Sequence, residues 1–200
     1  MAEDIRPGEP LVESVSEFAP YSGVARLLHW LTVVLVLIMS LSGLVMVYRG
    51  KDLNIWDQLT NTLYSGHKVL GLVVLAVVVV RLGYRLAKGA PPDEPGLNGL
   101  QRLVAHLTHW AMYALLICLP ILGWVGISMF PALGTFGGLQ IPALTAPDKA
   151  MSEQVLWVHG TLAYLLIVLI AMHIGAALFH HVIRGDNVLR RMLPSLKPRQ

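Results

Sequence analysis

Two histidines lie fourteen residues apart in a stretch that is otherwise almost entirely apolar. They are His159 and His173, within WVHGTLAYLLIVLIAMHIGAALFHHVIRG at residues 157–185. Fourteen residues of α-helix make about four turns and rise about 21 Å, so both imidazoles would share one helix face at two depths. Imidazole is a common metal ligand and titrates near neutral pH, and polar groups inside a membrane are usually functional. The spacing therefore indicates chemistry at two levels of one helix.

The same fourteen-residue step relates residues of the other apolar stretches. Fourteen residues after His29, His67 and His109 lie Gly43, Arg81 and Gly123, respectively. Because successive helices would run in opposite directions, these residues collect into two layers. The outer layer holds Gly43, His67, Gly123 and His159, and the inner layer holds His29, Arg81, His109 and His173.

The outer layer suits a haem. Two imidazoles would ligate the iron axially, and two glycines would leave room for the flat macrocycle between the helices. Gly43 and Gly123 could instead serve only close helix packing.

The inner layer has three histidines for two axial positions, and spacing alone leaves His109 and His173 both open as ligands. Arg81 suits a haem propionate, because guanidinium pairs with carboxylate in a bidentate manner, although it could simply mark the membrane boundary.

Four apolar runs must position these residues, at about 27–48, 67–86, 107–129 and 155–183. Each exceeds the roughly 18 residues expected of a membrane-spanning helix. The mean hydropathy is +0.62 and only 14% of residues are charged, against about 25% in soluble domains. The sequence predicts an all-α integral membrane four-helix bundle with no room for a soluble catalytic domain.

Basic residues predict the orientation of this bundle. Eleven of the fifteen Lys and Arg residues fall on the side of both termini, beside span ends, which predicts cytoplasmic N- and C-termini and no nucleic-acid partner. We expect residues 1–20 to be a mobile cytoplasmic tail, 21–194 the di-haem transmembrane domain, and 195–200 a second tail. The opposite side carries Arg49, Lys51, Lys68 and Lys149.

The connections differ in character. Residues 50–66 predict a short periplasmic loop, 89–99 a Pro- and Gly-rich cytoplasmic connection, and 130–154 a long apolar loop along the outer membrane surface. Pro120 should kink the third span. Cys118 is the single cysteine, so the chain has no internal disulfide and no covalent haem attachment motif.

Four motifs together resemble a known family. They are LLHW at 27–30, SGHKVLG at 65–71, AHLTHW with LPILGW within 105–124, and WVHGTLAYLLIVLIAMHIGAALFHHVIRGDNVLRRMLP at 157–194. This set resembles the bacterial cytochrome b-561 family of small four-helix, di-haem membrane cytochromes, over about residues 21–194. The fourth block is long and specific, whereas the HW pairs alone would be weak.

The resemblance implies two non-covalent b haems in the bacterial inner membrane. One would be ligated by His67 and His159 near the periplasm, and the other by His29 and His173 near the cytoplasm. His109 then becomes a spare polar group near a propionate or a quinone head. The activity implied is electron transfer between superoxide, oxidised on the periplasmic side, and ubiquinone within the lipid.

Further histidines are candidates for delivering protons to the quinone, namely His106, His109 and His180. Each could equally be a boundary or propionate-binding residue. His180 shares the helix face but lies about 31 Å along it from His159, which predicts a position at the cytoplasmic surface. The four basic residues of the outer side could attract an anion.

Two other functions fit parts of the pattern. A haem-bearing membrane anchor would pass electrons between quinone and a redox partner protein, such as a peripheral dehydrogenase or hydrogenase. A divalent-metal conduit would need acidic residues in its spans, and the four apolar runs contain no Asp or Glu.

Overall fold

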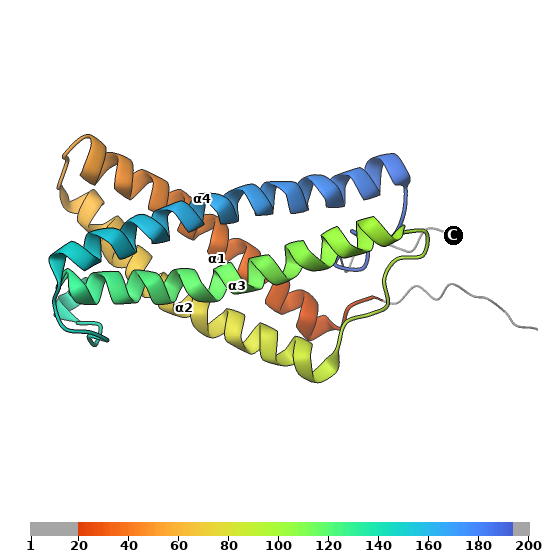
Figure 1. Cartoon of the computed structure of the whole chain (residues 1–200), viewed down its shortest axis with the longest axis horizontal. Coiled ribbons are helices and arrows are strands. Elements are labelled where there is room, and N and C mark those ends of the chain that lie inside the picture. Colours follow the sequence, from red (N-terminus) through yellow and green to blue (C-terminus); the bar gives the residue numbers. More distant parts are fainter. Residues whose placement is uncertain (1–19, 194–200) are drawn as a thin grey trace, which may run out of the picture.

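A computed structural model describes residues 20–193, so the predicted tails 1–20 and 195–200 lie, except for Pro20, outside the described residues. Four long helices form the fold (Figure 1), and the described residues contain no strand beyond an isolated bridge between Gly134 and Gln140. The helices are α1 (Gly23–Val47), α2 (Gln58–Lys88), α3 (Gly99–Met129) and α4 (Lys149–Phe179). Short turns are η1 (Tyr48–Asp52), η2 (Phe136–Gly138) and η3 (His180–Arg184), of which η1 and η3 extend α1 and α4.

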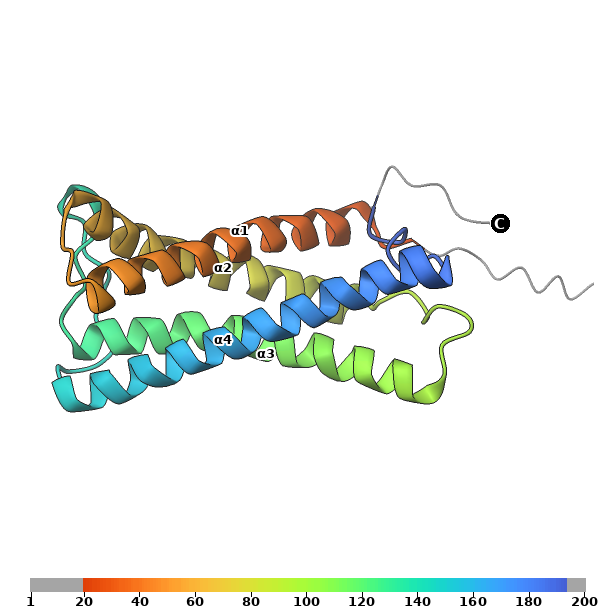
Figure 2. The same cartoon turned by 90° about the horizontal axis from the view of Figure 1, so that it is seen from above.

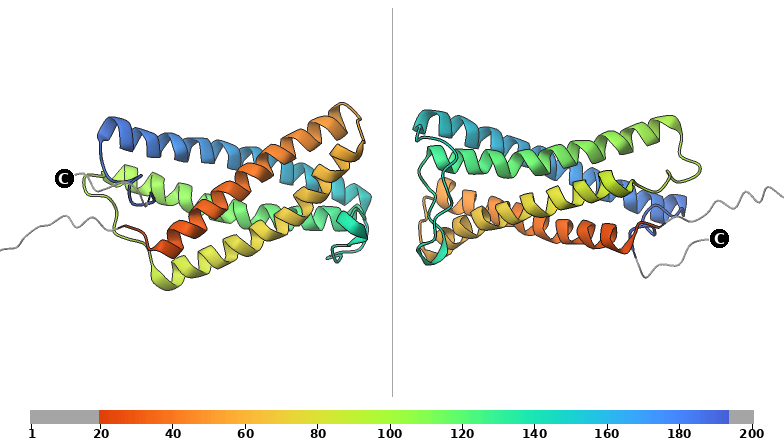
Figure 3. Two further views of the ribbon diagram at one scale, coloured as in Figure 1. Left: turned by 180° about the vertical axis from the view of Figure 1, so that it is seen from behind. Right: turned by 90° about the horizontal axis from the view of Figure 1, so that it is seen from below.

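The helices run up and down along the long axis of the molecule (Figure 1). We call the end where α1 and α3 begin the terminal end, and the end where α2 and α4 begin the loop end. Helix α1 packs on α2, α2 on α3, and α3 on α4, as two hairpins side by side (Figures 2 and 3). Helix α4 makes few close backbone contacts with α1 or α2. Side chains must therefore bridge those two helix pairs.

Each helix is long and apolar enough to cross a membrane, and its large apolar side chains face outward. In the most apolar 18-residue stretch of α4 only 6% of residues are buried inside the protein. A small core of Val36, Val74, Val78, Leu116 and Leu166 holds the hairpins together. The prediction of an all-α membrane four-helix bundle is confirmed, and the cytoplasmic placement of the termini stays a prediction.

Several helices begin earlier than the apolar runs predict. Helix α2 begins at Gln58, so the predicted loop at 50–66 shrinks to residues 53–57, and α4 begins at Lys149, inside the predicted loop at 130–154. The reason is local capping by Asp57, Asn98 and Asp148, whose side chains accept the free backbone N–H groups of the first turn. Hydropathy marks the part of a helix that meets lipid, and caps mark where the helix starts. Helix α3 continues through Pro120.

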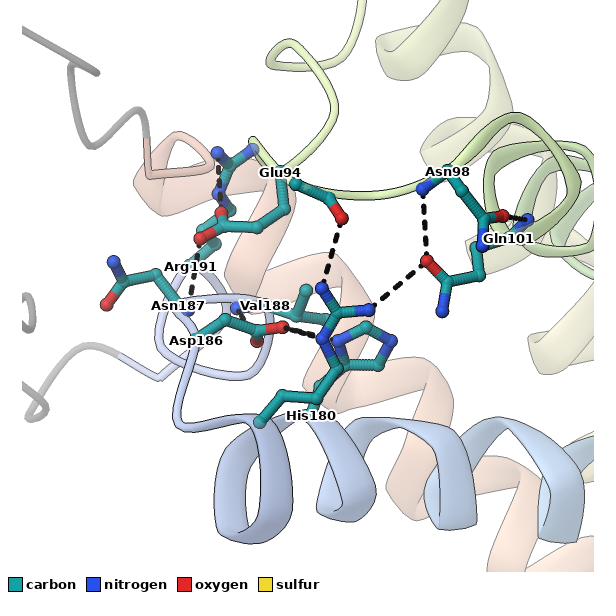
Figure 4. Close-up of polar contacts among 10 residues, drawn as sticks. Glu94, Asn98, Gln101, His180, Asp186, Asn187, Val188 and Arg191 are labelled. Carbon is teal, nitrogen blue, oxygen red and sulfur yellow. Dashed lines mark hydrogen bonds and ion pairs between the residues drawn. The ribbon is translucent and has the colours of Figure 1, made fainter.

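The segment after α4 folds back over the terminal end of the bundle. Arg191 forms an ion pair with Glu94 of the α2–α3 connection at 2.8 Å, and both side chains are only 9% exposed. The backbone N–H of Asn187 also donates to Glu94, as Figure 4 shows. On the other side, the Trp30 indole donates to the carbonyl oxygen of Met192. This segment thereby ties α1 to the α2–α3 connection.

We predict that Glu94→Ala destabilises the protein strongly, because it leaves the Arg191 guanidinium buried without a counter-charge. Loss of one partner of a buried ion pair costs about 3–5 kcal/mol. Thermal unfolding in detergent, followed by circular dichroism, measures the effect. Asp93→Ala is the matched control, because its pair with His106 is solvent-exposed and worth at most about 1 kcal/mol. Equal losses in the two variants would contradict the prediction.

Candidate functional site

Near the loop end, His67 of α2 faces His159 of α4. Their ring centroids are 6.3 Å apart and the ring planes are close to perpendicular, at 77°. The Nδ1 atom of His67 lies 3.3 Å from the hydroxyl oxygen of Ser42. That hydroxyl donates its own proton to the carbonyl oxygen of Met39, so its oxygen accepts from the Nδ1–H of His67. The Nε2 atom of His67 is then the unprotonated nitrogen.

The His159 imidazole has the same tautomer for a different reason. Its Nδ1 atom lies 2.9 Å from the backbone carbonyl oxygen of Leu119 in α3. A carbonyl oxygen only accepts hydrogen bonds, so Nδ1 carries the proton and Nε2 presents its lone pair. A histidine that ligates a metal commonly donates its other ring N–H in this way, which fixes the tautomer and the ring orientation.

Both imidazoles of this pair lie against a glycine. A Cβ atom at Gly43 would approach Cε1 of His67 to 3.1 Å, and one at Gly123 would approach Cε1 of His159 to 3.3 Å. The sequence predicted these glycines as clearance for a macrocycle. In the structure, the group that each glycine clears is the imidazole itself.

Near the terminal end, three histidines meet. The ring centroids of His29 in α1 and His173 in α4 are 6.4 Å apart, with an interplanar angle of 71°. His109 of α3 packs its ring edge against His173 at 5.2 Å. The structure therefore brings together the predicted members of both layers, each from the helix expected.

The ring separations test whether a metal fits between two of these imidazoles. Metal–imidazole bonds of about 2.0 Å place the centroids of two opposed axial rings about 6.3 Å apart. The His67–His159 and His29–His173 pairs match this spacing, and the His109–His173 pair is too close. Within residues 20–193, no group of three or more His, Cys, Asp or Glu could hold a metal ion. The spacing of the two pairs fits iron whose remaining ligands come from a flat macrocycle.

Arg81 distinguishes the terminal-end pair from the loop-end pair. Its Nη2 atom lies 2.9 Å from Nδ1 of His29, and a guanidinium only donates. Nδ1 of His29 is therefore the acceptor, and the ring proton sits on Nε2. For His29 to ligate a metal through Nε2, the Arg81 donor must turn away. The guanidinium also stacks over the Tyr113 ring at 5.3 Å from its centroid.

The other predicted proton carriers lie closer to the terminal end. His106 pairs with Asp93 at 3.0 Å and is half exposed. His180 pairs with Asp186 at 2.5 Å, and its side chain is only 15% exposed. The expectation that His180 lies at the surface holds only in part, because the segment after α4 covers it. No hydrogen bond or ring contact among the described residues joins His106, His109 and His180 to one another.

Sequence reasoning missed the groups that support the imidazoles. Ser42 directly precedes Gly43, so extending the register argument by one residue could have found it. The Leu119 carbonyl has no signature in the sequence, because any residue supplies a backbone carbonyl. Arg85 is one of the eleven basic residues that the sequence assigns to the side of the termini, and its guanidinium lies 6.0 Å from the centre of the same Tyr113 ring as Arg81.

Comparison with known proteins agrees with this arrangement. The sequence profile described as prokaryotic cytochrome b561 matches residues 20–195. The chain is similar to "Cytochrome b561 homolog 2" of Escherichia coli K12, with 30% identity over 86% of this chain and 90% of the relative. It is 29% identical to "Cytochrome b561 homolog 1" of the same organism, over 85% and 94%. It is 28% identical to "Probable superoxide oxidase CybB" of Yersinia pestis, over 87% and 96%.

We predict that Gly43→Val lowers metal or haem binding at the loop-end pair, because the added side chain must displace the His67 ring. Gly83→Val is the matched control on α2, since a Cβ atom there meets nothing within 4 Å. The haem content of purified protein, measured as the pyridine haemochrome, checks the effect. Full haem content in Gly43→Val would show that His67 does not need this clearance.

Proposed function

The chain belongs to the prokaryotic cytochrome b561 family of haem-binding membrane cytochromes that transfer electrons, and from this premise we propose that it carries two b haems. His67 and His159 hold one haem near the loop end, and His29 and His173 hold the other near the terminal end. The observation that carries this proposal is the matched ring separation of the two pairs, 6.3 and 6.4 Å. The pairs share α4, where fourteen residues separate the two levels by about 21 Å.

The chain's own residues prepare these positions unequally. Ser42 and Leu119 keep the Nε2 atoms of the loop-end pair unprotonated, and two glycines set the ring positions. When bound, each haem would be held by its two histidines and would supply iron that exchanges one electron. His109 is left to pack against His173 as a second polar neighbour.

We propose further that electrons pass from superoxide to ubiquinone. Two superoxide anions would give up one electron each and leave as dioxygen, and one ubiquinone would take both electrons with two protons to become ubiquinol. Support comes from the relative named a probable superoxide oxidase. The loop end would face the periplasm of a bacterial inner membrane, and the terminal end the cytoplasm.

The four basic residues at the loop end do not contribute equally to the attraction of an anion. Arg49 pairs with Asp57 at 2.5 Å. Backbone hydrogen bonding from Thr60, and then the Arg49 guanidinium, lower the pKa of Asp57 to about 2, so the pair is neutral overall at physiological pH. Lys68 donates to the carbonyls of Ala132 and Gly134. Lys51 and Lys149 are exposed, and they are our candidates for steering the anion.

At the terminal end, we propose that His106 and His180 relay protons to the quinone. Each ring is hydrogen-bonded to a carboxylate, Asp93 or Asp186, which fixes the orientation of the imidazole. His106 is the more exposed of the two and the better placed to take up a proton from water.

Purified protein in detergent tests the proposed function. We expect a b-type reduced-minus-oxidised spectrum with two haems per chain, and ubiquinol formation driven by a superoxide source. Lys51→Gln combined with Lys149→Gln should lower kcat/KM several-fold at low ionic strength and little at high ionic strength, because salt screens steering. If the protein contains two haems but reduces quinone only when a dehydrogenase is added, the membrane-anchor function is favoured instead.

We predict that His173→Ala loses the terminal-end haem, whereas His109→Ala retains it, because the His29–His173 spacing fits an axial pair and the His109–His173 spacing does not. His67→Ala should lose the loop-end haem alone. Haem per chain and the electron paramagnetic resonance signals of the ferric protein distinguish the two sites. Loss of haem in His109→Ala with retention in His173→Ala would reverse the proposed ligand assignment.

A further inference from the structure

A small cavity opens beside the terminal-end histidines, between α1, α2, α3 and the segment after α4. Its volume is about 30 Å³, more than the 10–15 Å³ that holds one water and far less than a macrocycle needs. The residues that line it include two arginines and three tyrosines, namely Arg81, Arg85, Tyr21, Tyr84 and Tyr113. A cavity of this size admits a small polar group or the end of a larger ligand.

The two arginines lie close together without a counter-charge in the described residues. They are one helical turn apart on α2, and both guanidiniums lie over the Tyr113 ring, at 5.3 and 6.0 Å. None of the ion pairs within residues 20–193 includes either of them. The hydrogen bond from Arg81 goes to His29, whose Nδ1 atom is a neutral acceptor.

Within residues 20–193, three carboxylates of the terminal end are engaged elsewhere. Asp93 pairs with His106, Glu94 with Arg191, and Asp186 with His180. The cavity wall itself contains no acidic residue. Two half-buried like charges repel each other in a partly dehydrated setting, so their placement is unfavourable unless an anion joins them.

We propose that Arg81 and Arg85 together form a binding site for one anionic oxygen group, a carboxylate or a phosphate. Guanidiniums are suited to such groups because their N–H donors match the two oxygens. The hydroxyl of Tyr84 already interacts with that of Ser22 at 2.9 Å, and it closes the α1 side of the site. Arg85 is the new residue of this site, because its guanidinium supplies a second set of N–H donors beside that of Arg81.

Two sources could supply the anionic oxygens. One is a carboxylate of the haem at the terminal-end pair, and this version rests on the proposed function. The contact between Arg81 and His29 favours the haem carboxylate as the source. A carboxylate that draws the Arg81 guanidinium into the cavity also frees Nδ1 of His29. The ring proton can then move to Nδ1, which permits ligation through Nε2. The other source is the phosphate of a membrane lipid at the same end of the bundle.

Full-length Arg85→Gln, Arg85→Lys and, as the control, Arg102→Gln test this site. Arg102 is exposed at the same end, and its guanidinium donates only to the carbonyl of Leu97. The measurements are the midpoint potential of each haem, the carboxylate bands in redox-difference infrared spectra, and the phospholipid phosphorus that copurifies per chain.

If a haem carboxylate occupies the site, Arg85→Gln lowers the midpoint potential of one haem only and shifts a carboxylate band in the infrared spectrum. Arg85→Lys partly restores the potential and the band. Arg102→Gln changes neither the potential nor the band. With a lipid phosphate, Arg85→Gln leaves the spectra unchanged and loses about one phosphate per chain, which also supports the site. Haem-loaded Arg85→Gln that matches wild type in all three measurements overturns this inference alone. Wild-type protein with neither haem nor an Arg85-dependent phosphate overturns it together with the proposed function.

Discussion

The pairing of buried imidazoles across α4 is the constraint on which the rest of the structure depends. Helix α4 makes few close backbone contacts with α1 and α2, yet His159 and His173 reach partners on those two helices. An imidazole within an apolar span is costly unless its nitrogens find partners. Ser42, Leu119 and Arg81 are such partners for three of the four rings. The ring contacts of His159 and His173 span the space between α4 and the opposite hairpin.

The two levels meet the demand in chemically different ways. At the loop end both partners of the imidazoles are acceptors, a serine hydroxyl and a backbone carbonyl, so the ligating tautomer is set by the protein alone. At the terminal end the partner of His29 is a donor, Arg81, which sets the opposite tautomer. The loop-end imidazoles therefore already have the tautomer that the proposed ligation requires, whereas His29 would reach it only once Arg81 turns away. A pair of sites that differ in this way will differ in the electrostatic environment of the bound group.

Sequence periodicity anticipated the layers because helix geometry is nearly invariant: a fourteen-residue step keeps His159 and His173 on one face whatever surrounds them. It left both His109 and His173 open as ligands, because the ring spacings, 6.4 Å for His29–His173 and 5.2 Å for His109–His173, can be read only from coordinates. It misplaced the start of α2, because Asp57 extends the helix beyond the apolar run. It also missed Leu119, since a backbone acceptor leaves no trace in residue type. Residue patterns thus give register, whereas hydrogen-bond direction needs coordinates.

The distribution of charge gives the two ends of the bundle different tasks. At the loop end, Arg49 is neutralised by Asp57 and Lys68 donates to a backbone carbonyl, which leaves Lys51 and Lys149 as the exposed basic residues of that end. At the terminal end there are two histidine–carboxylate pairs, and no ion pair within residues 20–193 includes Arg81 or Arg85. In the proposed function, an electron that crosses the bundle toward this end would arrive where these arginines could stabilise an anion and where histidines could carry protons. Reduction of a quinone would require both, which is the physical reason for placing it at this end in the proposal.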